Sequence, residues 1–222
     1  MSVLPWSYSR LSIYEKCPRQ FAFRYIEKVK VERTTSPQME RGTAMHNNIE
    51  QYLLGETKAL MPEVEDHREV FKELIEKKAT PELKIGLTRD WRPSEFDDPN
   101  AYVRGVLDTV FHVEQGASSL EWKSGKEYDD HADQRWLYLL FLRALHPEAT
   151  TLTVKTVYLD LNKNKSLVMV LPDDADEIDN VRQDFTNRMR TGEIDTDYAA
   201  RPGYYCSWCP FSRYKGGPCS IG

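Results

Sequence analysis

The chain switches between two hydrophobic periods, and this pattern predicts a mixed α/β fold. Apolar residues recur every three or four positions, as in amphipathic helices, in the segments 41–54, 66–78, 130–145 and 173–189. Apolar segments bounded by turn residues predict strands at 82–91, 102–113, 118–123, 152–161 and 166–171. Two short helices are predicted before them, the second beginning at Pro18. The central part of the chain therefore has the order helix, three strands, helix and strand.

The helical periods also predict core positions. The apolar stripe of the helix at 41–54 consists of Met45, Ile49, Tyr52 and Leu53. That of the helix at 66–78 consists of Val70, Phe71, Leu74 and Ile75. Each helix is expected to pack against the rest of the domain through this face.

Composition and charge narrow the class of protein. Of 222 residues, 40% are hydrophobic and 29% charged, which suffices for a buried core. We expect a single domain over 1–222, with a helical part at 1–64, a core at 65–172 and a C-terminal helix and cysteine-rich tail at 173–222. No apolar run reaches the roughly 18–20 residues of a membrane span, so a cytoplasmic protein without membrane contact is expected. The net charge of −5 argues against a protein that coats nucleic acid by bulk charge alone.

Two carboxylates and a lysine are predicted to meet on neighbouring strands. Asp108 lies in the segment 102–113, and Glu121 follows thirteen residues later, with Lys123 two residues beyond it. Residues two apart on a strand share a face, so Glu121 and Lys123 point the same way while Trp122 points oppositely. If the two strands form a hairpin, Asp108 reaches the same patch. Such a patch can bind Mg²⁺ and stabilise a phosphate under attack, although short acidic patterns also occur on ordinary solvated strands.

The order of these elements and motifs resembles the PD-(D/E)XK nucleases, and more closely their RecB-like branch. Four more segments fit that branch: Arg41-Gly-Thr-Ala-Met-His46, the acidic Glu82 at the first strand, Arg104-Gly-Val-Leu-Asp108, and Gln134-Arg-Trp-Leu-Tyr138. The resemblance implies an α/β restriction-endonuclease-like core and a DNA-hydrolysing enzyme dependent on Mg²⁺ or Mn²⁺. It covers nearly the whole chain, from Ser9 to Cys219.

The same resemblance implies roles for individual residues. The metal ligands are expected to be His46, Asp108, Glu121 and the backbone carbonyl of Trp122. The catalytic residues are expected to be Glu82, Asp108, Glu121 and Lys123. Lys123 is expected to orient the attacking water, and hydrolysis is expected to leave a 5′-phosphate and a 3′-hydroxyl. Gln134 and Tyr138, four residues apart on one helical face, are expected to contact DNA together.

Four cysteines remain in a chain for which a reducing compartment is expected, so metal or cluster ligation is the first hypothesis. Cys206 and Cys209 form a C-x₂-C pair, Cys219 follows, and Cys17 lies 189 positions before Cys206. One distant cysteine and three clustered ones resemble the iron-sulfur subset of RecB-like nucleases, which includes CRISPR-associated adaptation nucleases and phage-encoded relatives. The resemblance implies a [4Fe-4S] cluster; a structural zinc ion and free thiols are the alternatives.

The C-terminal tail interleaves aromatic and basic side chains. They are Tyr204, Tyr205, Trp208, Arg213, Tyr214 and Lys215. Such a pattern can stack on and neutralise single-stranded DNA, or the aromatic rings can shield a cluster from solvent. The sequence leaves both interpretations open.

These observations lead to one functional hypothesis with two rivals. The chain is predicted to be a DNA exonuclease acting on single strands or DNA ends, 5′ to 3′, alongside CRISPR adaptation or recombination proteins. It is expected in a prokaryotic cytoplasm, or in that of the host if phage-encoded. The rivals are a structure-dependent or sequence-specific endonuclease and a zinc-stabilised, non-catalytic DNA-binding adaptor.

Overall fold

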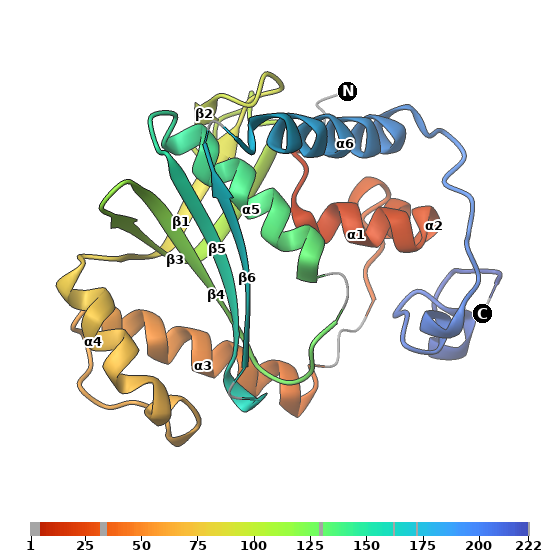
Figure 1. Cartoon of the computed structure of the whole chain (residues 1–222). Helices are drawn as coiled ribbons and strands as arrows, with labels where there is room; N and C mark the ends of the chain where they lie inside the picture. The colour runs from red at the N-terminus through yellow and green to blue at the C-terminus, as the bar shows by residue number, and fades with distance from the viewer. Residues whose placement is uncertain (1–4, 32–34, 129–130, 162, 172, 222) are drawn as a thin grey trace. The chain divides into compact units, whose positions relative to one another are not determined.

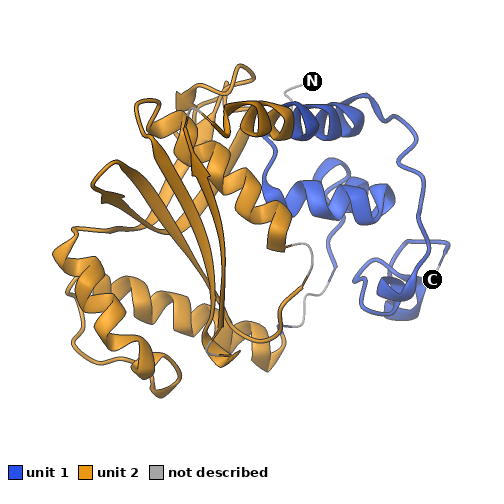
Figure 2. Cartoon of the chain, in the orientation of Figure 1, with its two compact units in different colours: residues 1–35, 183–222 blue, residues 36–182 orange. Residues whose placement is uncertain are grey.

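A six-stranded mixed sheet forms the centre of the larger of two compact units, residues 36–182 (Figures 1 and 2). The computed structural model describes residues 5–31, 35–128, 131–161, 163–171 and 173–221. The strand order is β2-β1-β3-β4-β5-β6. The strands are β1 (Thr80–Leu87), β2 (Pro93–Ser94), β3 (Val103–Val113), β4 (Gly116–Lys123), β5 (Thr151–Tyr158) and β6 (Lys163–Val170).

Chain connections explain the directions of these strands. β3 and β4 are antiparallel and joined by a short turn, which is the predicted hairpin. β4 and β5 are parallel, because helix α5 (His131–Leu145) returns the chain to the end of the sheet at which β4 begins. The other neighbouring strands are antiparallel. The predicted α/β core, with helix, strands, helix and strand in that order, is thus confirmed.

Helices of this unit begin at sequence signals that the chain supplies. In α3 (Pro37–Leu53), Ser36 caps the N-terminus by accepting a hydrogen bond from the amide of Met39, and Pro37 occupies the first turn. The 3₁₀ helix η2 (Pro62–His67) leads into α4 (Arg68–Glu76). At Gly105 on β3, a side chain would collide with Phe141 of α5, with only 2.8 Å from the added Cβ to the ring. The glycine therefore allows α5 to approach the sheet closely.

The core between α3, α4 and the sheet matches one predicted stripe and corrects the other. Met45, Ile49, Tyr52 and Leu53 of α3 are all buried, as expected. On α4, only Phe71 and Leu74 are buried, whereas Val70 and Ile75 are 40% and 44% exposed. The short α4 has two turns and contacts the core through a narrow strip, so it cannot bury a stripe of four apolar side chains.

Phe71 is expected to be a principal anchor of α4. It is fully buried and its ring meets that of Trp122 edge-on, with 5.3 Å between the centroids. Phe71→Ala should lower the free energy of unfolding by about 3–5 kcal/mol, because it removes a buried ring and leaves a cavity. Val70→Ala, one residue away on the exposed side, should change it by less than about 1 kcal/mol. Urea denaturation of both variants measures the difference; equal effects would contradict this packing.

The smaller unit combines residues 1–35 and 183–222 (Figure 2). It contains α1 (Tyr8–Lys16), α2 (Pro18–Phe21), the π-helical turn η1 (Ala22–Ile26), the end of α6 (Ala175–Ile194), and the 3₁₀ turns η4 (Tyr204–Ser207) and η5 (Arg213–Lys215). Trp6, Tyr14 and Phe21 form an aromatic cluster. Arg188 of α6 donates two hydrogen bonds to the carboxylate of Glu15, at 2.6 and 2.8 Å. The two chain ends thus fold together.

Some boundaries differ from the predicted ones. The unit of 36–182 includes α3. The short strand β2 falls in a segment predicted to be turns. The helix predicted at 130–145 begins at His131, and residues 129–130 lie outside the described part of the chain. No described helix combines the length and apolar character needed to span a membrane.

Candidate active site

Asp108 lies at the centre of three neighbouring strands. The pairs Pro81↔Thr109 and Leu83↔Leu107 flank it on the β1 side, which places Glu82 beside Asp108. On the β4 side Thr109 pairs with Leu120, so in this antiparallel pair the next residue of β4, Glu121, lies opposite Asp108. The backbone amide of Trp122 donates to the Asp108 carboxylate at 2.8 Å, so this side chain also holds the adjoining strand. Carboxylates of β1, β3 and β4 therefore converge at one level of the sheet.

A histidine from α3 reaches the same place. His46 Nε2 lies 2.8 Å from the carbonyl oxygen of Trp122, and its Nδ1 lies 3.5 Å from Asp108 Oδ2. Burial lowers the pKa of His46, so its imidazole is neutral near neutral pH, the form that binds metal ions. Ligand atoms of His46, Glu82 and Asp108 all lie within 4.8 Å of one another. The predicted proximity of a helical His to the strand carboxylates is therefore present in the fold.

Glu82 adopts an unusual backbone conformation at this site. Its φ angle is +47°, in the left-handed region that non-glycine residues rarely occupy. Burial, together with the charges of Glu50 and Glu121, raises the pKa of its carboxyl. Backbone strain of this kind occurs often at active sites and ligand-binding sites.

Only one of the two carboxylate oxygens of Glu121 is hydrogen-bonded among the described residues. Its Oε1 accepts hydrogen bonds from Lys123 Nζ at 2.6 Å and from Gln134 Nε2 at 2.8 Å. Its Oε2 is buried and has no hydrogen-bond partner among the described residues. An unpaired buried carboxylate oxygen is costly, which indicates that a cation belongs beside it.

Gln134 and Tyr138 lie inside the protein, which corrects the expectation that they contact DNA together. They are 8% and 7% exposed. The amide of Gln134 also donates to the Tyr138 hydroxyl at 3.0 Å, and that hydroxyl donates to the carbonyl oxygen of Val106 on β3 at 2.9 Å. Burial and the nearby Glu121 raise the pKa of Tyr138, which keeps its hydroxyl protonated as a donor. These two side chains therefore orient Glu121.

Removing this support should weaken metal binding more than folding. Gln134→Ala deletes the amide that orients Glu121, and we expect metal affinity to fall about 10–100-fold, as when other supports of ligands are lost. Isothermal titration with Mn²⁺ measures the effect. Gln183→Ala, which deletes an exposed amide on α6 that donates to Asn187, serves as the matched control. Equal affinity of the Gln134 variant and the control would show that Gln134 does not position Glu121.

The cluster opens into a groove within the larger unit. His46, Glu82 and Asp108 share its lining with Glu50, Lys84 and Lys126, among others. Asp160 also lines it and accepts from both terminal nitrogens of Arg41, at 2.6 and 2.9 Å, and from the amide of Gly125. Sequence reasoning singled out neither Glu50 nor Asp160. Arg41 and Asp160 are 119 residues apart, and no local motif marks their pairing.

The charges of the site are unbalanced without a cation. Burial, and then the charge of Glu121, raises the pKa of Asp108 well above its usual range. Burial lowers the pKa of Lys123, but the Glu121 and Asp108 carboxylates more than offset this and raise it, so its ammonium is charged. One ammonium thus faces three carboxylates at one level of the sheet.

The donors present fit a hard divalent cation. Carboxylate oxygens, a backbone carbonyl and a neutral imidazole are available together, and the orphaned Oε2 of Glu121 supplies a further oxygen. The hydrogen bond between His46 Nε2 and the Trp122 carbonyl oxygen, at 2.8 Å, fixes the imidazole with its Nδ1 facing Asp108 Oδ2 at 3.5 Å.

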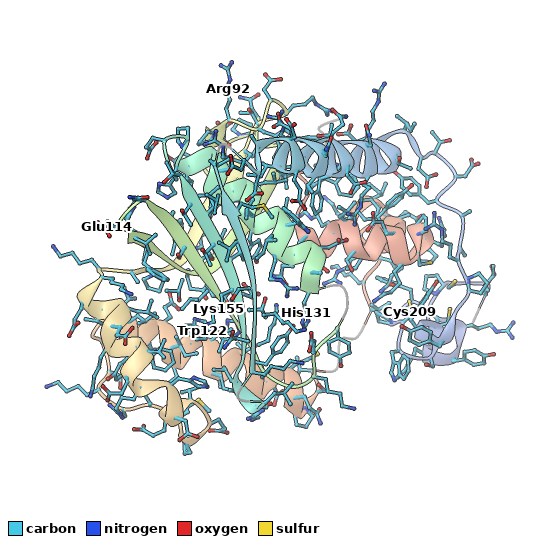
Figure 3. All side chains as sticks on the ribbon, viewed as in Figure 1. Arg92, Glu114, Trp122, His131, Lys155 and Cys209 are labelled. Atoms are coloured by element: carbon cyan, nitrogen blue, oxygen red, sulfur yellow. The ribbon has the colours of Figure 1, made fainter. Side chains whose placement is uncertain are left out.

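The four cysteines come together in the smaller unit. Cys17, Cys206, Cys209 and Cys219 line one cavity, and none of them forms a disulfide. The amide of Gly203 donates to Cys206 Sγ at 3.4 Å, and burial raises the pKa of Cys209. Cys17 of the N-terminal segment and the three cysteines of the tail therefore line the same cavity (Cys209 is labelled in Figure 3).

Three solved structures are similar to the chain over most of its length. A protein named SSO0001 is 16% identical, with a TM-score of 0.46 over 97% of this chain and 85% of that chain. A "putative exonuclease" from Eubacterium rectale is 10% identical, with a TM-score of 0.43 over 86% and 83%. A phage related exonuclease from Haemophilus somnus is 9% identical, with a TM-score of 0.30 over 85% and 93%.

The family of the chain follows from its sequence as a whole. The mixed six-stranded sheet with its helices is consistent with the PD-(D/E)XK fold. The family model of the PD-(D/E)XK nuclease superfamily matches residues 5–214, and the chain belongs to this superfamily. A search of curated proteins gave no significant match.

Proposed function

We propose that the chain is a Mg²⁺- or Mn²⁺-dependent DNA exonuclease that acts on single strands or DNA ends in the 5′-to-3′ direction. The observation that carries this proposal is the convergence of His46, Glu82 and Asp108, whose ligand atoms lie within 4.8 Å of one another. Glu121 lies outside that group, but its charge acts on Asp108 and its Oε2 is buried without a partner among the described residues. The proposed ligands are His46, Asp108, Glu121 and the Trp122 carbonyl, with Glu82 assisting. Its proposed setting is CRISPR adaptation or phage DNA processing and recombination.

The chain's own residues provide the rest of the chemistry. A bound Mg²⁺ or Mn²⁺ would polarise the scissile phosphate and acidify a coordinated water. Lys123, whose ammonium lies 2.6 Å from Glu121 Oε1, is proposed to orient the attacking water and to stabilise charge developing on the phosphate. Glu82, half-buried with a raised pKa, can accept a proton through water. Gln134 and Tyr138 hold Glu121 in place throughout.

We further propose that the four cysteines bind a [4Fe-4S] cluster. The four thiols line one cavity of the smaller unit, and burial and then the charges of the other three raise the pKa of Cys209, so all four are near neighbours. Four thiolates are the usual ligand set of such a cluster. A structural zinc ion, which four cysteines also bind, is the alternative that the metal content of the purified protein distinguishes.

Linear and circular substrates distinguish an exonuclease from an endonuclease. We expect linear single-stranded DNA to be degraded in Mg²⁺ or Mn²⁺, with a 5′ label released in short products before a 3′ label. Circular DNA of the same sequence should resist, because it offers no end. Cleavage of the circle at the same rate as the linear strand would overturn the exonuclease assignment and favour the endonuclease.

A further inference from the structure

The two compact units carry opposite net charge. Residues 1–35 and 183–222 contain 12 Lys and Arg against 7 Asp and Glu, a net charge of +5. Residues 36–182, which hold the carboxylate cluster, contain 18 against 28, a net charge of −10. A DNA backbone is repelled by the second unit and attracted by the first. Attraction of the substrate is therefore expected to come from the smaller unit.

The tail of this unit exposes three large aromatic side chains. Tyr204, Trp208 and Tyr214 are 80%, 71% and 78% exposed. The rings of Tyr204 and Trp208 meet edge-on, with centroids 6.0 Å apart, so their faces are not stacked against each other. Consecutive i→i+3 backbone hydrogen bonds fold residues 203–216 into a run of tight turns. The three rings are thus carried by one short, folded segment.

These rings do not shield the cysteine cavity. Its aromatic lining consists of Phe23, Tyr205 and Phe211. Phe23 and Phe211 are 3% and 2% exposed and contact each other, and the Tyr205 hydroxyl is tied to the carbonyl oxygen of Lys16 at 2.8 Å. Tyr204, Trp208 and Tyr214 are absent from the described lining. Of the two interpretations that the sequence left open, shielding applies to Tyr205 and not to these three.

Basic side chains lie next to these exposed rings, in a segment without acidic residues. Arg213 and Lys215 flank Tyr214, both are exposed, and no ion pair with another described residue engages either one. The segment 201–222 contains no Asp or Glu. Free cations next to exposed rings are complementary to a strand whose phosphates alternate with flat bases.

We infer that Tyr204, Trp208, Tyr214, Arg213 and Lys215, here called the tail platform, form a binding surface for single-stranded DNA. The bases stack on the rings and the phosphates pair with the two cations. Duplex DNA binds this surface poorly, since its base faces are already stacked on each other. This inference rests on the proposed function for its choice of DNA, but it assigns strand selection to a part of the chain outside the carboxylate cluster.

Substitutions at Trp208 separate stacking from other contacts. Binding of a fluorescent oligo(dT) to the full chain is measured by anisotropy in EDTA, so that cleavage plays no part. Trp208→Ala should raise the Kd about 5- to 150-fold, the range found when a stacking ring is removed. Trp208→Leu should do the same, whereas Trp208→Phe should stay near the wild type. Unchanged circular dichroism confirms folding, which is expected at so exposed a position.

A charge test is independent of the rings. Substituting both Arg213 and Lys215 by Ala should weaken oligo(dT) binding and make it less sensitive to salt. Arg92→Ala, at an exposed arginine of the larger unit (labelled in Figure 3), should change neither. Duplex DNA of the same length should bind equally to all Trp208 variants.

The outcomes distinguish this surface from the nuclease proposal. Wild-type affinity of Trp208→Ala, or retained affinity of Trp208→Leu, would overturn base stacking and leave the tail platform as a contact for a protein partner. A wild-type chain that does not bind oligo(dT) would also overturn it. Oligo(dT) binding that depends on Trp208, in a chain that fails to cleave DNA with Mg²⁺, would support the surface and refute the nuclease proposal.

Discussion

Lys123→Ala is expected to reduce DNA cleavage by about 10²–10³-fold, the loss typical when a charge-stabilising donor is removed from an active site. The Lys123 ammonium is held 2.6 Å from Glu121 Oε1 and shares its face of the sheet with Asp108. Alanine removes the only cation that this carboxylate contacts among the described residues. Folding should persist, because the Lys123 side chain contributes little to the apolar core.

The neighbouring strand offers a matched control for Lys123. Lys155 of β5 pairs with Leu120 in the parallel ladder, so its side chain lies on the face opposite to Glu121 and Lys123. Lys155→Ala makes the same change of charge. It should leave the cleavage rate within about twofold of the wild type, because Lys155 makes no contact with the transition state. Rates measured on labelled single-stranded DNA in Mg²⁺ decide the matter. Equal rates of the two variants would remove Lys123 from the mechanism.

Cys206→Ala is expected to abolish binding of the proposed [4Fe-4S] cluster. Cys206 is one of four thiols lining a single cavity, and three thiolates hold a four-iron cluster poorly. Anaerobically purified wild type should be brown and contain about four irons per chain, whereas the variant should lose the visible absorption and most of the iron. The tail has few aliphatic residues to hold it, so proteolysis at 195–221 should also become faster.

A serine in the same turn provides the control for the cluster. Ser207 follows Cys206 in η4, and its hydroxyl donates to the carbonyl oxygen of Tyr204. Ser207→Ala should retain colour and iron. A Cys206 variant with an unchanged visible spectrum would refute the cluster, and stoichiometric zinc in a colourless wild type would restore the adaptor hypothesis.

The sequence predicted the fold and the main acidic positions because both depend on local patterns. Strand periodicity placed Glu121 and Lys123 on one face, and a short turn made the hairpin with β3 the simplest pairing. The buried stripe of α3 follows from spacing alone. The same reasoning overestimated the buried face of α4, because Val70 and Ile75 have the right spacing but remain exposed.

Other features of the site depend on contacts that spacing does not encode. Gln134 and Tyr138 share a helical face, but the sequence does not say whether that face meets solvent or the sheet. The packing of α5 turns it toward Glu121. The pairing of Arg41 with Asp160 and the left-handed conformation of Glu82 are set by tertiary structure alone. The strand order brings Glu82 beside Asp108; the family resemblance predicted Glu82 in the site, but the spacing of the two residues did not.

The most direct test of the account is metal-dependent hydrolysis of end-labelled single-stranded DNA by the wild type and by Asp108→Asn. Asp108 lies between Glu82 and Glu121, so asparagine keeps the shape of the side chain while removing the charge that a cation needs. We predict cleavage by the wild type in Mg²⁺ or Mn²⁺, none in EDTA, and a loss of at least about 10²-fold in the folded variant. Cleavage that persists in EDTA, or in Asp108→Asn at the wild-type rate, would contradict the assignment of this site.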